Sequence, residues 1–160
     1  MREATMHENQ GPVLARRTIR VAMREIDQAG VIYFPVAYEW HEGLFTSWMA
    51  VIGQPISRLL PRGMATATVA SRANYLRPLR MDDVVDLALT AGRAGTASFV
   101  LQTAVRKSGE SQIAIEVEST HVWTALTVVG IDKPRELSAQ PLAPWLREAL
   151  TTQVDEPPIV

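Results

Sequence analysis

The chain has 160 residues, of which 47% are hydrophobic and 21% charged, enough for one domain with a substantial core. Sixteen Lys+Arg against seventeen Asp+Glu give a formal net charge of −1, so no broad positive field favours nucleic acid or an anionic membrane as a partner. The absence of cysteine excludes disulfides, zinc–thiolate sites, iron–sulfur clusters and thiol nucleophiles. Polar first residues and the lack of a long apolar run predict a cytoplasmic protein without a membrane span.

The first predicted elements are a strand, a turn and one long helix. Alternation of apolar and polar residues predicts a strand over residues 17–23, and a turn follows over residues 25–31. Residues 35–52 are predicted as a helix, because Pro35 suits a first helical position and Gly53 suits a stop. The apolar stripe predicted for this helix consists of Ala37, Trp40, Leu44, Trp48 and Val51.

The second half of the chain is predicted to be mainly strand. Short turns containing Gly or Asp separate four segments rich in β-branched residues. These segments are residues 65–76, 84–91, 98–106 and 112–127. A short helix is predicted to begin at Pro144. One helix followed by a run of strands indicates an α+β fold, in which an antiparallel sheet carries the helix on one face.

The whole chain is predicted to form a single domain. We expect its core to span about residues 16–137, with a loose N-terminal arm over 1–15 and a loose tail over 151–160, where acidic residues precede a Pro-Pro pair. Because one helix covers only one face of a sheet, the remaining face or an edge should meet another copy of the chain.

The segment with the most chemical information lies just before the long helix. Asp27 stands in a Gly-containing turn, and the start of a helix offers unpaired N–H donors and a partial positive charge. Pro35 has no N–H, so the candidate donors are Phe34, Val36 and Ala37. A carboxylate beside such donors can serve attack on a carbonyl, since one group activates or supplies the nucleophile and the other stabilises the oxyanion. Taken alone, an Asp before a helix is more often a turn former or a helix cap than a catalyst.

Two motifs resemble those of a known family. Residues Asp27, Gly30, Val31, Ile32 and Tyr33 match a pattern of Asp-x-x-Gly, two hydrophobic residues and an aromatic one before the long helix. Residues 75–83, YLRPLRMDD, resemble the family's aromatic-x-x-Pro-x-x-x-x-Asp strand end. Over about residues 16–137 the chain resembles hot-dog-fold acyl-CoA thioesterases of the 4-hydroxybenzoyl-CoA thioesterase family. That fold is one long helix wrapped by a curved antiparallel sheet of about five strands.

The resemblance implies a hydrolase that cleaves an acyl-CoA thioester to the free acid and CoA. It implies that Asp27 acts as nucleophile or as base on water, and that the Phe34 N–H polarises the thioester carbonyl. Phe34-Pro35 stands where the branch acting on aliphatic substrates often has a His, which favours an aromatic, 4-hydroxybenzoyl-type acyl group or another bulky one. The resemblance also implies no metal and no cofactor besides the CoA of the substrate, and a homotetramer built as a dimer of dimers.

Further residues are candidates for substrate binding. Gly30 and Tyr33 belong to the matched motif. Thr66 is expected to face the helix start of a second subunit, although strand propensity explains it equally well. Arg77 and Arg80 are candidates for the CoA phosphates, because guanidinium groups match phosphate geometry, although each also suits an ordinary solvated surface.

Several alternatives remain open at this point. Glu42 and Glu39 lie on the predicted helix, and Glu42 is a rival to Asp27 because related thioesterases place their carboxylate on this helix. His41 and His121 are interpreted as packing residues. The substrate could instead be a short or medium aliphatic acyl-CoA or an acyl carrier protein. A non-catalytic module that binds acyl thioesters is a further alternative. It would be marked by an Asp27 turned away from the helix start, or by an ion pair between Asp27 and Arg24.

Overall fold

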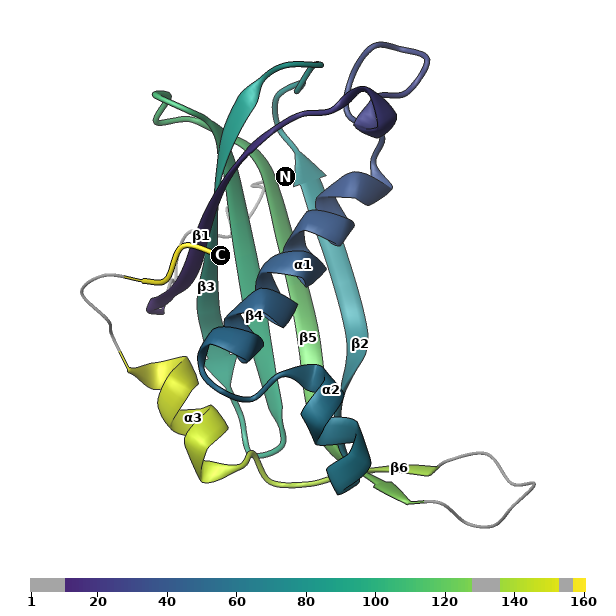
Figure 1. The fold of residues 1–160 in the computed structure, drawn as a ribbon, viewed down its shortest axis with the longest axis vertical. Coiled ribbons are helices and arrows are strands. Elements are labelled where there is room, and N and C mark those ends of the chain that lie inside the picture. The colour runs from purple at the N-terminus through teal and green to yellow at the C-terminus, as the bar shows by residue number, and fades with distance from the viewer. Residues whose placement is uncertain (1–10, 128–135, 153–156) are drawn as a thin grey trace, which may run out of the picture.

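The structure, a computed structural model, describes residues 11–127, 136–152 and 157–160. Within these residues, one long helix lies across one face of an antiparallel sheet (Figure 1). The strands are β1 (Val13–Arg20), β2 (Met64–Tyr75), β3 (Val84–Ala94), β4 (Ser98–Lys107), β5 (Ile113–Thr127) and β6 (Glu136–Ala139). The helices are α1 (Pro35–Val51), α2 (Ile56–Leu59) and α3 (Pro144–Thr151), with 3-10 turns η2 (Met23–Glu25) and η3 (Leu60–Arg62).

The order of strands across the sheet is β1-β3-β4-β5-β2, and β6 pairs with the end of β5. All of these pairs are antiparallel. The expected α+β fold, with one long helix on a sheet, is therefore confirmed. The sheet has six strands where about five were expected, because residues 136–139 fold back onto β5.

The long helix begins at Pro35 as predicted and ends at Val51. Its buried side chains are Val36, Ala37, His41, Leu44, Phe45, Trp48 and Met49. Two members of the predicted stripe are not part of this set. Val51 is 56% exposed, and Trp40 is half-buried with its indole N–H donating to Glu25 Oε1 at 3.1 Å. The helix is thus rotated so that the row through His41 and Phe45 meets the sheet.

Strand β1 lies earlier in the chain than predicted. Its pairing with β3 runs from Val13 opposite Thr90 to Arg20 opposite Val84. Met23, predicted to end the strand, falls in η2 and is 80% exposed. Pairing with β3 therefore sets the bounds of β1, and the alternation of apolar and polar residues over 17–23 does not.

The end of the chain lies against the outer edge of β1. The Arg16 N–H donates to the Pro158 carbonyl at 2.9 Å, and the Val160 N–H donates to the Arg16 carbonyl at 3.0 Å. Residues 157–160 are therefore bound to the sheet, whereas a loose tail was expected over 151–160. Helix α3 begins at Pro144 as predicted and buries Leu146 and Leu150. Residues 1–10 of the expected N-terminal arm lie outside the described residues.

The other outer strand, β2, is largely exposed along its length. It runs the length of the sheet and ends beside the start of α1 (Figure 1). Val69 in its middle is 60% exposed, and Tyr75 at its end is 43% exposed. The register between β2 and β5 shifts between Thr68 and Ala70, which places Val69 at an irregularity in the strand.

Candidate functional site

The turn that carries Asp27 is closed by backbone hydrogen bonds. The Asp27 N–H donates to the Val31 carbonyl at 2.9 Å, and the Gly30 N–H donates to the Asp27 carbonyl at 3.0 Å. Gly30 adopts φ +75°, a left-handed conformation that favours glycine. The Ala29 N–H donates to Asp27 Oδ1 at 2.8 Å, so Asp27 does form a local turn. This bond leaves Oδ2 without a hydrogen bond to any described residue, and therefore available for chemistry.

The backbone N–H groups at the helix start are nearly all engaged or buried. The Tyr33 N–H donates to the Glu25 carbonyl at 2.8 Å, and the Val36 N–H donates to the Tyr33 carbonyl at 3.0 Å. Ala37 is fully buried in the core. Among the described residues, no acceptor is found for the Phe34 N–H. Of the three donors proposed from the sequence, Phe34 is the one that can serve a ligand.

The electrostatics of this helix end favour a negative charge. Phe34 is the N-cap residue and makes no side-chain capping bond, and the first turn contains no acidic residue. The partial positive charge at the start of a helix is therefore not neutralised by the helix's own side chains.

Asp27 and Phe34 line the same groove. It has a volume of about 400 Å³ and lies where the turn, the start of α1 and the end of β2 meet. Its lining residues are Asp27, Val31, Ile32, Tyr33, Phe34, Tyr75, Leu76, Arg77 and Pro78. Most of these side chains are apolar, with one carboxylate and one guanidinium among them. The groove is therefore suited to an apolar group bound beside Asp27.

The sequence did not reveal the role of Tyr75. Its hydroxyl donates a hydrogen bond to the Phe34 carbonyl, 41 residues away in the chain. Burial, followed by the nearby Tyr38, raises the pKa of Tyr75, so the hydroxyl keeps its proton and remains a donor at neutral pH. The only signal in the sequence was the aromatic residue that opens the motif of residues 75–83.

Two of the five predicted substrate-binding residues, Tyr33 and Arg77, line the groove. Gly30 shapes the turn but does not line the groove. Arg80 also lies outside the lining, and its backbone N–H donates to Asp83 Oδ2 at 2.7 Å.

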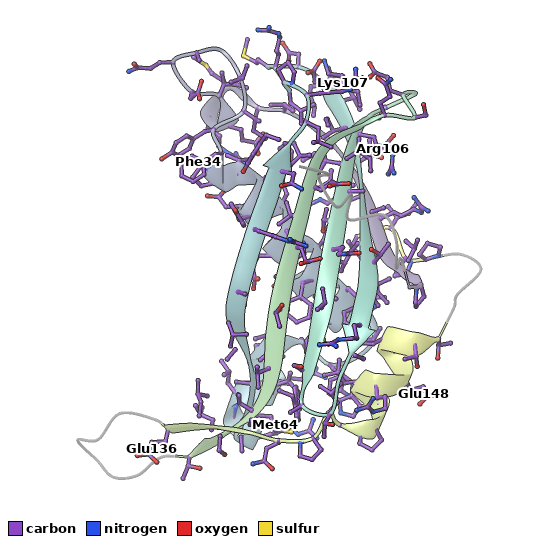
Figure 2. All side chains as sticks on the ribbon, turned by 180° about the vertical axis from the view of Figure 1, so that it is seen from behind. Phe34, Met64, Arg106, Lys107, Glu136 and Glu148 are labelled. Atoms are coloured by element: carbon purple, nitrogen blue, oxygen red, sulfur yellow. The ribbon has the colours of Figure 1, made fainter. Side chains whose placement is uncertain are left out.

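Thr66 lies far from the groove within this chain. It pairs with Trp123 near the start of β2, and nine residues separate it from Tyr75 at the other end. At about 3.3 Å per residue, this separation is about 30 Å. Figure 2 shows Phe34 and Met64, the first residue of β2, toward opposite ends of the long axis.

The rival residues on α1 do not share the groove. Glu42 is exposed on the helix, and Glu39 lines a different pocket, between α1 and β1. No ion pair joins Asp27 to Arg24 in the part of the chain that the structure describes. One of the two features that would mark a non-catalytic binding module is thus not observed there, and Asp27 lines the same groove as Phe34.

The two histidines are connected in the core between α1 and the sheet. His41 Nδ1 lies 2.7 Å from Thr103 Oγ1, and His41 Nε2 lies 2.7 Å from Ser119 Oγ. The same Ser119 Oγ lies 2.7 Å from His121 Nε2. His121 Nδ1 in turn lies 3.3 Å from Thr68 Oγ1, at the exposed strand β2.

Burial lowers the pKa of both histidines to about 4, and for His41 the neighbouring His121 adds to this effect. Both rings are therefore neutral at physiological pH. Neither lines the groove, and the described residues contain no group of three or more His, Cys, Asp or Glu side chains placed to hold a metal. The pair is interpreted as a polar network within the core.

In the described residues, every helix is too short or too polar to cross a membrane.

Comparison with known proteins adds sequence evidence on the family. A family model described as the Thioesterase-like superfamily matches residues 21–150. A 1,4-dihydroxy-2-naphthoyl-CoA hydrolase from Prochlorococcus marinus (strain NATL2A) is 24% identical over 142 residues, covering 84% of this chain and 86% of the relative.

Solved structures confirm the fold. A 1,4-dihydroxy-2-naphthoyl-CoA thioesterase from Synechocystis superposes with a TM-score of 0.71 at 19% identity, covering 84% of this chain and 93% of that one. A 4-hydroxybenzoyl-CoA thioesterase variant, complexed with 4-hydroxybenzoyl-CoA, gives a TM-score of 0.72 at 18% identity, covering 85% of this chain and 97% of that one. The hot-dog fold implied by the sequence motifs is therefore confirmed.

Proposed function

Since the chain belongs to the Thioesterase-like superfamily, we propose that it is an acyl-CoA thioesterase, which hydrolyses an acyl-CoA to the free acid and CoA. The observation that carries this proposal is the shared groove. Two groups line this groove at the start of the helix. One is the Asp27 carboxylate, which has an unengaged oxygen, and the other is the Phe34 N–H, which has no acceptor among the described residues.

The chemistry needs only these groups and water. In one route, Asp27 Oδ2 attacks the thioester carbon, the C–S bond breaks, and the CoA sulfur leaves as a thiolate that takes up a proton. Water then hydrolyses the resulting mixed anhydride and restores Asp27. In the other route, Asp27 accepts a proton from water while that water attacks the carbon. The C–S bond then breaks, and the CoA sulfur leaves and takes up the proton, which restores Asp27. In both routes the Phe34 N–H donates to the carbonyl oxygen as negative charge develops on it.

We further propose an aromatic acyl group. Three aromatic side chains line the groove, and they are unusually exposed for their size: Tyr33 49%, Phe34 59% and Tyr75 43%. The rings of Tyr33 and Phe34 lie edge to face, with centroids 5.3 Å apart. A planar acyl group can stack on such rings. The curated relative and both solved structures are named for aromatic acyl-CoA substrates, which supports the same assignment.

Cationic side chains at and near the groove favour CoA as the carrier of the acyl group. Arg77 is the cationic member of the lining, and Arg80 follows three residues later in the same exposed loop. The Arg77 guanidinium suits a phosphate of CoA while the acyl group lies in the groove, and we propose Arg80 as a second phosphate-binding residue from the same loop. We further propose that the protein is cytoplasmic, which the absence of cysteine fits.

The proposed active unit is a homodimer, and two dimers form the tetramer. β2 is exposed along one edge, and a second copy can pair with it in antiparallel fashion. In such a pair the start of one β2 approaches the end of the other. This arrangement brings the partner subunit's Thr66 toward the groove at Tyr75, which accounts for a residue that lies far from the groove within one chain.

A panel of CoA esters tests the proposed substrate. Release of free thiol would be followed for benzoyl, 4-hydroxybenzoyl, 1,4-dihydroxy-2-naphthoyl, acetyl, hexanoyl and palmitoyl esters. We expect kcat/KM to be highest for an aromatic ester, because planar rings can stack in the groove. The rate should not change when a chelator is added. Absence of thiol release from every ester would contradict the proposed activity, and a preference for an aliphatic ester would contradict the aromatic assignment.

The role of Asp27 is tested by Asp27→Asn, with Glu42→Gln as the matched control on α1. We expect Asp27→Asn to lower kcat by a factor of about 1,000 or more, because the amide is neither a nucleophile nor a base. Glu42→Gln should retain normal turnover, since Glu42 does not line the groove. The opposite pattern would transfer the catalytic role to Glu42.

A further inference from the structure

The backbone around Phe34 is fixed on both sides, although Phe34 itself lacks a side-chain cap. Before it, the Tyr33 N–H is bound to the Glu25 carbonyl, and the Tyr33 carbonyl accepts from the Val36 N–H. After it, the Phe34 carbonyl accepts from the Tyr75 hydroxyl. The contact from Tyr75 is therefore the one that ties Phe34 to the sheet.

The backbone of Tyr75 is a rigid support for this contact. Tyr75 pairs with Ile115 at the end of β2. The next two residues, Leu76 and Arg77, both donate their N–H groups to the Ala114 carbonyl, at 2.8 and 3.0 Å. The backbone from which the Tyr75 side chain extends is therefore fixed to β5. The sheet thus positions the start of the helix through one hydroxyl.

We infer that Tyr75 is a positioning residue for the hydrolysis, and that its hydroxyl holds Phe34 so that the Phe34 N–H meets the thioester oxygen in the transition state. This inference rests on the proposed function. Tyr75 does not itself donate to the substrate, because its hydroxyl proton is used by the Phe34 carbonyl. A hydrogen bond to a developing oxyanion depends strongly on the placement of its donor, so a small displacement of Phe34 should reduce the rate of the chemical step.

The test is Tyr75→Phe, which removes the hydroxyl and keeps the ring in the groove. With the best ester of the panel, we expect kcat to fall by about 10- to 100-fold while KM stays within about threefold. The matched control is Tyr38→Phe. Tyr38 lies near Tyr75 but is outside the groove lining, and its hydroxyl makes no hydrogen bond to a described residue. The control should retain normal turnover.

A second measurement does not depend on activity. The chain has three phenylalanines, so labelling with ¹⁵N-phenylalanine gives three backbone amide signals. Phe45 and Phe99 are buried, at 2% and 1% exposure, whereas the Phe34 N–H makes no hydrogen bond to a described residue and should exchange fastest with solvent. We expect Tyr75→Phe to move or broaden the fast-exchanging signal and to leave the other two in place.

The outcomes separate the two proposals. A fall in kcat together with a changed Phe34 signal supports the positioning role. A kcat within about twofold of the unmodified protein, or an unchanged Phe34 signal, would overturn it. A rise in KM at constant kcat would also overturn it, since this result would assign Tyr75 to substrate binding. If the unmodified protein released no thiol from any ester, the proposed function would fail. The Phe34 signal would still show whether the Tyr75 hydroxyl holds Phe34 in place.

Discussion

At the scale of single residues, the backbone N–H of Phe34 is the group that most clearly separates this site from an ordinary turn before a helix. Asp27 uses one oxygen to form such a turn, as many aspartates do. The N–H groups of Tyr33 and Val36 are bound within the same few residues. Phe34 thus leaves one donor unengaged in the groove that Asp27 also lines, and the proposed chemistry requires this combination.

A pair of substitutions can test this N–H directly. Phe34 has φ −53°, which proline can adopt, so Phe34→Pro removes the N–H with little change in φ. Phe34→Ala removes the same aromatic ring but keeps the N–H. We expect kcat of Phe34→Pro to be about 100-fold below that of Phe34→Ala, measured with the best ester of the panel.

Circular dichroism of both Phe34 variants provides the control, since their helix content should match. Equal turnover in the two folded variants would contradict the assignment of the Phe34 N–H. The ring itself would then be the only contribution of Phe34 to the groove.

At the scale of elements, the contact between α1 and the sheet contains an unusual polar connection. His41 on α1 and His121 on β5 share Ser119, and both rings are almost fully buried. A serine hydroxyl has one proton, so it can donate to only one of the two rings. In the neutral pair, the other ring must donate to Ser119. This polar network lies against Phe45 and Phe99, whose rings are 4.9 and 5.1 Å from that of His121.

This network makes a prediction about stability and pH. Both histidines have a folded-state pKa of about 4, against an ordinary value of 6.5, so below pH 6.5 the unfolded chain binds more protons than the folded one. The free energy of unfolding should therefore fall as the pH drops from 6.5 toward 4, by up to about 1.4 kcal/mol per pH unit for each histidine. Denaturant unfolding at pH 7, 6 and 5 measures this slope.

The control for the pH prediction is His121→Gln, which can keep a hydrogen bond to Ser119 and does not titrate. The slope between pH 6.5 and 5 should be about half as steep in this variant. A free energy of unfolding that stays constant over this range in the unmodified protein would show that the histidines are not held neutral in the core.

The elements that the sequence predicted well are those with a strong local pattern. The long helix was predicted to within one residue, because a Pro and a Gly bracket a run of helical spacing. The strands β2 to β5 were also predicted closely, because short turns separate runs of β-branched residues. β6 and α2 were missed, since four residues each carry too little pattern to stand out. β1 lies earlier in the chain than predicted because its bounds depend on pairing with β3, and a short stretch of sequence around β1 does not contain β3.

The same distinction applies to the candidate site. Asp27, Tyr33 and Phe34 were proposed from the motif before the helix and Arg77 from the separate motif at residues 75–83, and the structure brings them into one groove. The contact of Tyr75 with Phe34 joins residues 41 positions apart, and only the folded sheet places them together. The expected role of Thr66 requires a second subunit, so neither local pattern nor one folded chain can test it.

At the scale of the whole molecule, the exposed strand β2 leads to a prediction about assembly. Val69 lies in the middle of this strand and is 60% exposed. In the proposed dimer, Val69→Lys places two charges near the two-fold axis, where like charges repel. We expect this variant to sediment as a 17.7 kDa monomer and to lose most of its thioesterase activity, because the groove would lack the partner subunit's Thr66.

The matched control for assembly is Ile159→Lys. Ile159 is 85% exposed but lies on the other outer edge of the sheet, where the end of the chain pairs with β1. The charge is the same, and the oligomer should persist. Dissociation by Ile159→Lys but not by Val69→Lys would assign the interface to the β1 edge.

The hydrogen bonds between residues 157–160 and Arg16 have a consequence for how copies of the chain can join. A sheet with two open outer strands could add neighbours indefinitely, each β2 docking on the next β1, and grow into a fibre. Here the terminal residues occupy the middle of β1, so an incoming strand would first have to displace them. In the proposed dimer, growth by edge pairing would therefore stop once two β2 strands have met, because residues 157–160 cover β1.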